Sequence, residues 1–152
     1  MFKYVRKDAG FQLKYKEDYK MILEINNIDL KKVTDLLSVV ELNAKASRAR
    51  VKLNRKLADK LNDFAQDIEE LKHEYEGDEL NEHFAELITE KAVIDVTEHR
   101  HLLMTLKNEL EEYDKPLKED DAVAHDILLD ELERICEENG LEETNKNEKD
   151  DE

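Results

Sequence analysis

The stretch 43–76, NAKASRARVKLNRKLADKLNDFAQDIEELKHEYE, decides the fold of this 152-residue chain. Its apolar side chains recur every three or four residues, with a mean step of about 3.7, the period of a nearly straight helix. These positions are Leu42, Ala46, Ala49, Leu53, Leu57, Leu61, Phe64, Ile68, Leu71 and Tyr75. A helix of about 34 residues is about 50 Å long, whereas a compact domain of this size is about 38 Å across. We therefore expect the helix to extend beyond its own body, with its stripe covered in an elongated bundle or by another subunit.

The flanking sequence predicts shorter elements on both sides of this helix. Before it, 11–15 and 21–25 are extended in pattern, and Asp29 is a plausible N-cap for a helix over 30–41. After the break at Gly77 we expect a helix over 78–90, followed by a strand over 92–96.

The last part of the chain predicts two more helices. Thr97 is placed to cap a helix that runs to Tyr113, and Asp120 or Asp121 to cap a final helix that Gly140 ends. The predicted fold is mainly α: an elongated helical bundle or long helical hairpin, with a small two-stranded β ribbon formed by 21–25 and 92–96. We divide the chain into an N-terminal extension (1–20), a single helical domain (21–139) and a disordered acidic tail (140–152).

Composition narrows the class of protein. The net charge is −16 and 42% of residues are charged, so non-specific binding to nucleic acid or to anionic membranes is unfavourable. No run of eighteen apolar residues predicts a membrane span. The single Cys136 has no partner for a disulfide or for metal-ligand spacing, which favours a buried structural role in a cytoplasmic protein.

The charge is divided unequally along the chain. Residues 1–60 carry a net charge of +7 and residues 61–152 carry −23. Basic residues cluster at the start of the long helix and acidic residues at its end, so the charges at both ends interact unfavourably with the helix macrodipole. Each exposed charge destabilises the helix by about 0.3–1 kcal/mol. We expect the basic residues to dock acidic protein surface, the alternative being a solvated face with weak ion pairs. They are Lys45, Arg48, Arg50, Lys52, Arg55 and Lys56.

Two acidic surfaces could bind these basic residues. The last helix carries Asp126, Asp130, Glu131 and Glu133 and could lie beside the basic stretch. The acidic half of a second copy could do the same in an antiparallel dimer.

No pattern in the sequence predicts an enzyme, a cofactor or a metal site. His99 and His101 are two residues apart and point away from each other on a helix. The pairs Glu79/Glu82 and Glu111/Asp114 match a nucleotide pyrophosphohydrolase pattern, but chance alone produces about ten such acid pairs in a chain this acidic.

Three stretches carry a resemblance to a known family: LNAKASRARVKLNRKL (42–57), KAVIDVTEHRHLLMTLKNELEEYDKPL (91–117) and DAVAHDILLDELE (121–133). Over roughly 21–133 the chain resembles small uncharacterised proteins of tailed phages and prophages of Gram-positive bacteria, usually encoded near the tail and lysis genes. The most specific part is the run Lys45–Lys52. Residues 1–20 and the short turn around Gly77 depart from the family pattern. The family has no known catalytic residues, and the resemblance implies a viral setting in the host cytosol.

We therefore expect a non-enzymatic helical interaction or accessory protein of a phage, related to virion or tail morphogenesis, that self-associates or binds a protein partner. The alternative is an acidic DNA mimic that inhibits a host nuclease or defence enzyme, because clustered carboxylates can replace a row of phosphates.

Overall fold

A computed structural model describes residues 20–139. The elements are β1 (Ile22–Asn26), η1 (Asn27–Asp29), α2 (Leu30–Val39), α3 (Ala44–Glu74), α4 (Gly77–Thr89), β2 (Lys91–Asp95), η2 (Thr97–His99), α5 (Arg100–Glu111) and α6 (Glu119–Glu138). The predicted mainly α fold with a small two-stranded ribbon is confirmed. The predicted strand over 11–15, most of the N-terminal extension and the acidic tail lie outside the described residues.

The two strands form an antiparallel ribbon in which Leu23 pairs with Ile94 and Ile25 with Ala92. These four side chains are buried, while the alternate residues of β2 are exposed, as the period of two in a strand dictates. The ribbon joins segments about seventy residues apart in sequence, as predicted.

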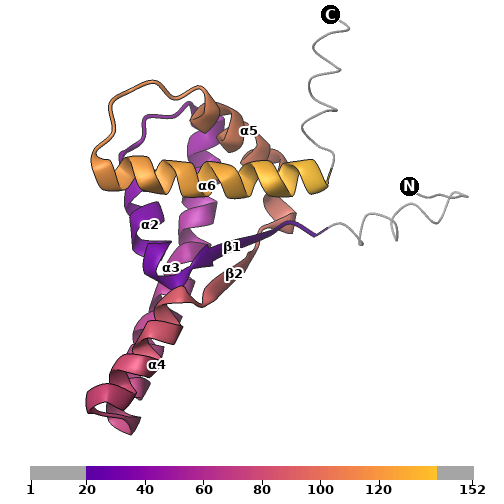
Figure 1. Cartoon of the computed structure of the whole chain (residues 1–152). Coiled ribbons are helices and arrows are strands. Elements are labelled where there is room, and N and C mark those ends of the chain that lie inside the picture. The colour runs from indigo at the N-terminus through magenta and orange to yellow at the C-terminus, as the bar shows by residue number, and fades with distance from the viewer. Residues whose placement is uncertain (1–19, 140–152) are drawn as a thin grey trace, which may run out of the picture.

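The body of the molecule consists of α2, α5, α6 and the first half of α3, packed around one apolar core (Figure 1). Helix α6 crosses the front of the body and packs on α2, α5 and β1. Its inward residues recur at helical spacing and include Ala124, Leu128 and Leu132, all fully buried. Cys136 is also buried in this core, as predicted.

Helix α3 is continuous over 31 residues, about 46 Å. The side chain of Asn43 caps its start by accepting a hydrogen bond of 2.9 Å from the Ala46 N–H. All its fully buried residues lie in the first half, the last being Leu57. The prediction that this helix outruns its body is therefore confirmed.

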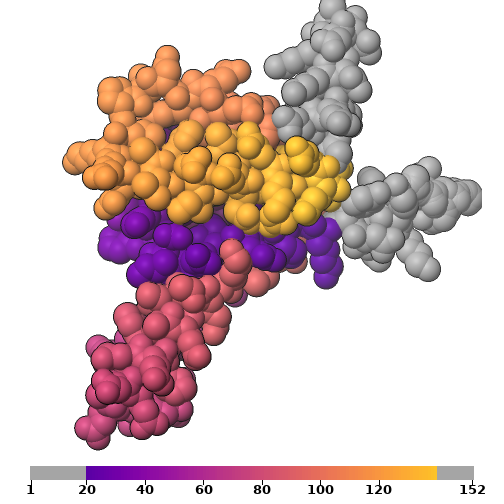
Figure 2. Space-filling model, in the orientation of Figure 1, coloured from indigo at the N-terminus to yellow at the C-terminus, as the bar shows by residue number. Residues whose placement is uncertain are grey.

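The second half of α3 projects from the body together with α4, and we call residues 61–90 the arm (Figure 2). The chain reverses at Gly77, whose φ of +62° is one that L side chains rarely adopt. Helix α4 then returns along α3 and leads into β2, so that the arm is a two-helix hairpin whose base contacts η1 through Asn27 (Figure 1).

Of the predicted caps, one holds in position only and the others are wrong. Asp29 is the N-cap residue of α2, as predicted, but its backbone has αR geometry and its side chain makes no capping hydrogen bond. The final helix starts at Glu119 after Lys118, so Asp120 and Asp121 lie inside its first turn. Thr97 begins a short 3-10 turn, and its hydroxyl oxygen accepts a 2.9 Å hydrogen bond from the Met21 N–H instead of capping α5.

Candidate protein-interaction surface

The predicted docking residues occupy the first four turns of α3 and fall into two groups. Arg50 points at the end of α2, where its guanidinium donates to the carbonyl oxygens of Leu37 (3.1 Å) and Val40. The last carbonyls of a helix have no partner within the helix. Arg50 therefore caps α2 and has a structural role within the chain.

Lys56 is also used within the body. Its ammonium lies 3.2 Å from the Glu98 carboxylate, and only 30% of its side chain is exposed. The other four predicted residues, Lys45, Arg48, Lys52 and Arg55, form no ion pair or side-chain hydrogen bond within residues 20–139. Lys45, Arg48 and Arg55 are exposed and Lys52 is half-buried.

The acidic last helix does not neutralise these four residues. Within the described part of the chain no ion pair joins α6 to α3. Two of the four acids proposed for that role are engaged elsewhere: Glu131 binds Arg134 and β1, and Glu133 faces Glu111 of α5. The intramolecular source of acidic surface is therefore absent from the described structure.

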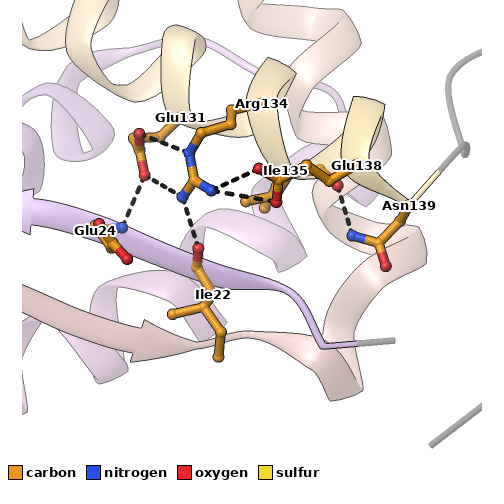
Figure 3. A network of polar contacts seen from close by, with 7 residues as sticks. All are labelled: Ile22, Glu24, Glu131, Arg134, Ile135, Glu138 and Asn139. Atoms are coloured by element: carbon orange, nitrogen blue, oxygen red, sulfur yellow. Dashed lines mark hydrogen bonds and ion pairs between the residues drawn. The ribbon is translucent and has the colours of Figure 1, made fainter. Parts of the chain in front are cut away.

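Figure 3 shows the polar contacts that Glu131 and Arg134 make with β1. Its carboxylate accepts a 2.8 Å hydrogen bond from the Glu24 N–H, and Arg134 donates to the Ile22 carbonyl at 2.9 Å and to Glu131 at 2.8 Å. These two side chains of α6 take the place of a neighbouring strand along the outer edge of β1. Burial raises the pKa of Glu131, but the hydrogen bonds from Arg134 and Glu24 outweigh it, so the net pKa is lowered.

The arm is densely acidic. Residues 61–90 include eleven acidic and one basic side chain, a net charge of −10. A shallow groove of about 260 Å³ runs between α3 and α4. Its lining residues are Asp67, Glu70, Leu71, Glu74, His83, Glu86, Leu87 and Glu90. Tyr75 stacks on His83 at the tip, with ring centroids 4.0 Å apart.

The arm also leaves apolar surface uncovered. Phe84 of α4 is 39% exposed. Leu61, Phe64 and Ile68 of α3, which the sequence predicts as inward-facing, are only partly buried. Leu61 packs against the core of the body, and α4 packs along the part of α3 that lies in the arm. A two-helix hairpin cannot enclose its own seam, and so half-exposed apolar positions remain along it.

Chemical sites are not evident in the described structure. No group of three or more His, Cys, Asp or Glu side chains within residues 20–139 is arranged to hold a metal ion. Lys107, only 1% exposed, lies 3.6 Å from Glu111 at the contact between α5 and α6. Burial raises the pKa of the neighbouring Glu133, and a hydrogen bond with Glu111 raises it further. This cluster lies between packed helices and does not line the groove between α3 and α4.

Sequence reasoning missed two features of this surface. It located the acids at the end of α3, but it did not place them in a groove with Glu86 and Glu90 of the returning helix. It also gave no indication that Phe84 is exposed. The signal for both was the short turn at Gly77, which brings α4 back along the second half of α3.

None of the helices in the described part of the chain is long and apolar enough to cross a membrane. No protein-family model, curated protein or solved structure matches the chain.

Proposed function

We propose that this chain is a non-enzymatic protein-interaction protein that acts through α3 and its arm. The observation that carries the proposal is the burial pattern of α3. The apolar stripe of one continuous helix is fully buried in its first half and only partly buried, mainly against α4, in its second half. A projecting hairpin with half-exposed apolar side chains and a dense charge is a surface suited to a protein partner.

The biological setting that we propose is a bacteriophage, with the protein acting in the host cytosol as an accessory of virion or tail morphogenesis. This setting depends on the resemblance of the run Lys45–Lys52 and its neighbours to small phage proteins. The geometry of the arm supports the proposed protein-interaction role. It carries no information on whether the protein comes from a phage.

The experiment is an affinity pull-down from phage-infected cells with the wild-type chain and two variants. Phe84→Ser removes the most exposed apolar side chain of the arm. Val123→Ser is the matched control, since Val123 on α6 is 42% exposed but belongs to the body. We expect a protein partner to be retained by wild type and V123S and lost or weakened with F84S. Equal recovery of every protein by the three baits would contradict the proposal.

A second candidate function is inhibition of a host nuclease or defence enzyme by imitation of DNA. The net charge of −10 on the arm and the carboxylates along its groove favour this candidate. It predicts that the protein competes with DNA for such an enzyme at low salt. The competition should disappear in E70Q/E74Q/E86Q, whereas neutralising the acids of α5 and α6 should matter less.

A further inference from the structure

One side of α3 changes sign along its length. At about 100° per residue, nine charged residues of α3 fall within an arc of about 100° around the helix. Lys56, which pairs with Glu98, and Asp59 lie near its middle, and Glu74 lies at its end. The other six, in chain order, are Lys45, Arg48, Lys52, Asp63, Asp67 and Glu70. All are exposed except the half-buried Lys52. We call this side the graded face: its body half is positive and its arm half is negative.

These six charges of the graded face have no partners within the described chain. No ion pair or side-chain hydrogen bond to any of the six occurs among residues 20–139. This differs from Arg50, which caps α2, and from Lys56 within the same arc, which pairs with Glu98. The macrodipole makes the arrangement unfavourable, because the bases lie near the helix start and the acids toward its end.

The spacing along the graded face is self-complementary. Lys45 and Lys52 are seven residues apart, and so are Asp63 and Glu70. When two copies of α3 run antiparallel with a two-fold axis between positions 57 and 58, Lys45 faces Glu70 of the other copy and Lys52 faces Asp63. Arg48 then faces Asp67. A two-fold interface repeats each contact, so the three kinds of pair occur twice.

The acidic half is also recessed in a way that fits long basic side chains. Asp67 and Glu70 line the groove between α3 and α4, together with Glu74, Glu86 and Glu90. Asp63 lines a second groove between α3 and β2, beside the exposed Val93. A Lys or Arg side chain reaching into the groove between α3 and α4 meets several carboxylates and keeps its methylene groups against the groove wall. The second groove carries Asp59, Asp63 and Asp95 together with Lys56 and Lys60.

We infer that the graded face of α3 is a self-association surface, on which a second copy of this chain binds antiparallel, with the basic half of each α3 on the acidic half of the other. This inference deepens the proposed function, since it names the partner of the same helix. Because the interface consists mainly of exposed ion pairs, the association is weak and strongly dependent on salt.

Two charge-reversal variants and their mixture test the inference. K45E/K52E makes the face of each copy mainly negative, and D63K/E70K makes it mainly positive. Each variant alone should lose self-association by at least about tenfold, because attraction becomes repulsion at four contacts of the dimer. In an equimolar mixture, the new carboxylates at positions 45 and 52 of one variant would lie opposite the new ammonium groups at positions 70 and 63 of the other. The native pairs form at the other half, so the mixture should associate again.

The measurement is sedimentation equilibrium on the full chain at concentrations up to about 100 µM, where weak dimers are populated. Wild type should dimerise at an ionic strength of about 0.1 M and become monomeric at about 1 M, as the Debye length falls from about 10 to 3 Å. Both variants place charges that favour the macrodipole, so loss of folding is not expected and circular dichroism checks it.

The outcomes separate this inference from the proposed function. A monomeric wild type at low salt, or a mixture that stays monomeric, overturns self-association. If the wild-type chain still retains a partner from infected cells in an arm-dependent manner, the proposed function stands with a different partner. If wild type dimerises and the mixture of variants re-associates, the second copy is the partner on the graded face.

Discussion

Truncating one leucine in each half of α3 should have very different effects on stability. Leu57 is fully buried in the body, and Leu71 lies on the arm, partly exposed beside the groove. Leucine and alanine have nearly the same helix propensity, so the two substitutions differ mainly in packing. Leu57→Ala removes buried methyl groups and leaves a cavity, for which we expect a loss of about 3 kcal/mol. Leu71→Ala removes half-solvated atoms and leaves no enclosed cavity, for which we expect about 1 kcal/mol.

The assay is urea denaturation followed by far-UV circular dichroism, at low protein concentration and high salt so that self-association does not contribute. For a chain of this size the two losses correspond to falls in melting temperature of about 10 °C for L57A and about 3 °C for L71A. Losses that agree within about 0.5 kcal/mol would refute the reasoning, because Leu71 would then be as enclosed as Leu57 and the arm could not project from the body.

Individual contacts give three further predictions. Arg50→Met should cost about 1–2 kcal/mol, because the end of α2 loses its donors, and Arg48→Met, the control, should cost less than about 0.5 kcal/mol in the same denaturation assay. Hydrogen bonds from the hydroxyl and N–H of Thr97 lower the pKa of Asp95, and the net pKa of Glu131 is also lowered. The two carboxylates therefore stabilise the folded state above their ordinary pKa values of 3.8 and 4.5. This stability is lost as the pH falls through the lower pKa values of the folded state. Below these pH values, the free energy of unfolding of D95N/E131Q should therefore change less with pH than that of wild type. An unchanged pH profile would contradict this role of the two carboxylates. The pKa of Glu133 is raised by burial and by Glu111, so Glu133→Gln should stabilise the protein at neutral pH and lose this effect at acidic pH where the wild-type carboxyl is protonated in both states.

The long helix and the ribbon could be predicted because their causes are local. A stripe with a mean period of about 3.7 residues fixes a straight helix whatever packs on it. The β-branched run at 92–96 needs a strand partner, and 21–25 was the only suitable segment identified within the predicted domain. Both features depend on the pattern of side chains along one segment.

The caps were predicted less well because capping depends on the residues just outside the helix. Asp120 and Asp121 favour a helix start by their charge, and they do so equally well from inside the first turn, where Glu119 precedes them. Thr97 was a reasonable cap by composition, but its hydroxyl joins Asp95 to the Met21 N–H and so fixes the end of the ribbon. Nothing in the local sequence distinguishes these uses.

The docking residues illustrate the same limit. The sequence identified six bases on α3 but could not separate them, because the separation depends on what lies across from each one. Arg50 contacts the carbonyl end of α2, which the loop before α3 turns toward it. Lys56 contacts Glu98, which is distant along the chain. The remaining bases make no ion pair within the described residues, and Lys45, Arg48 and Lys52 lie in line with Asp63, Asp67 and Glu70.

The antiparallel pairing of α3 is tested most directly by cysteine cross-linking in a chain whose buried Cys136 is replaced by alanine. With the axis between positions 57 and 58, the two copies of residue 59 lie about 5 Å apart along the helix, whereas the two copies of residue 70 lie about 37 Å apart. We predict that Asp59→Cys cross-links between copies at low salt and that Glu70→Cys does not. Cross-linking of E70C with none of D59C, or equal cross-linking of both, would contradict the account.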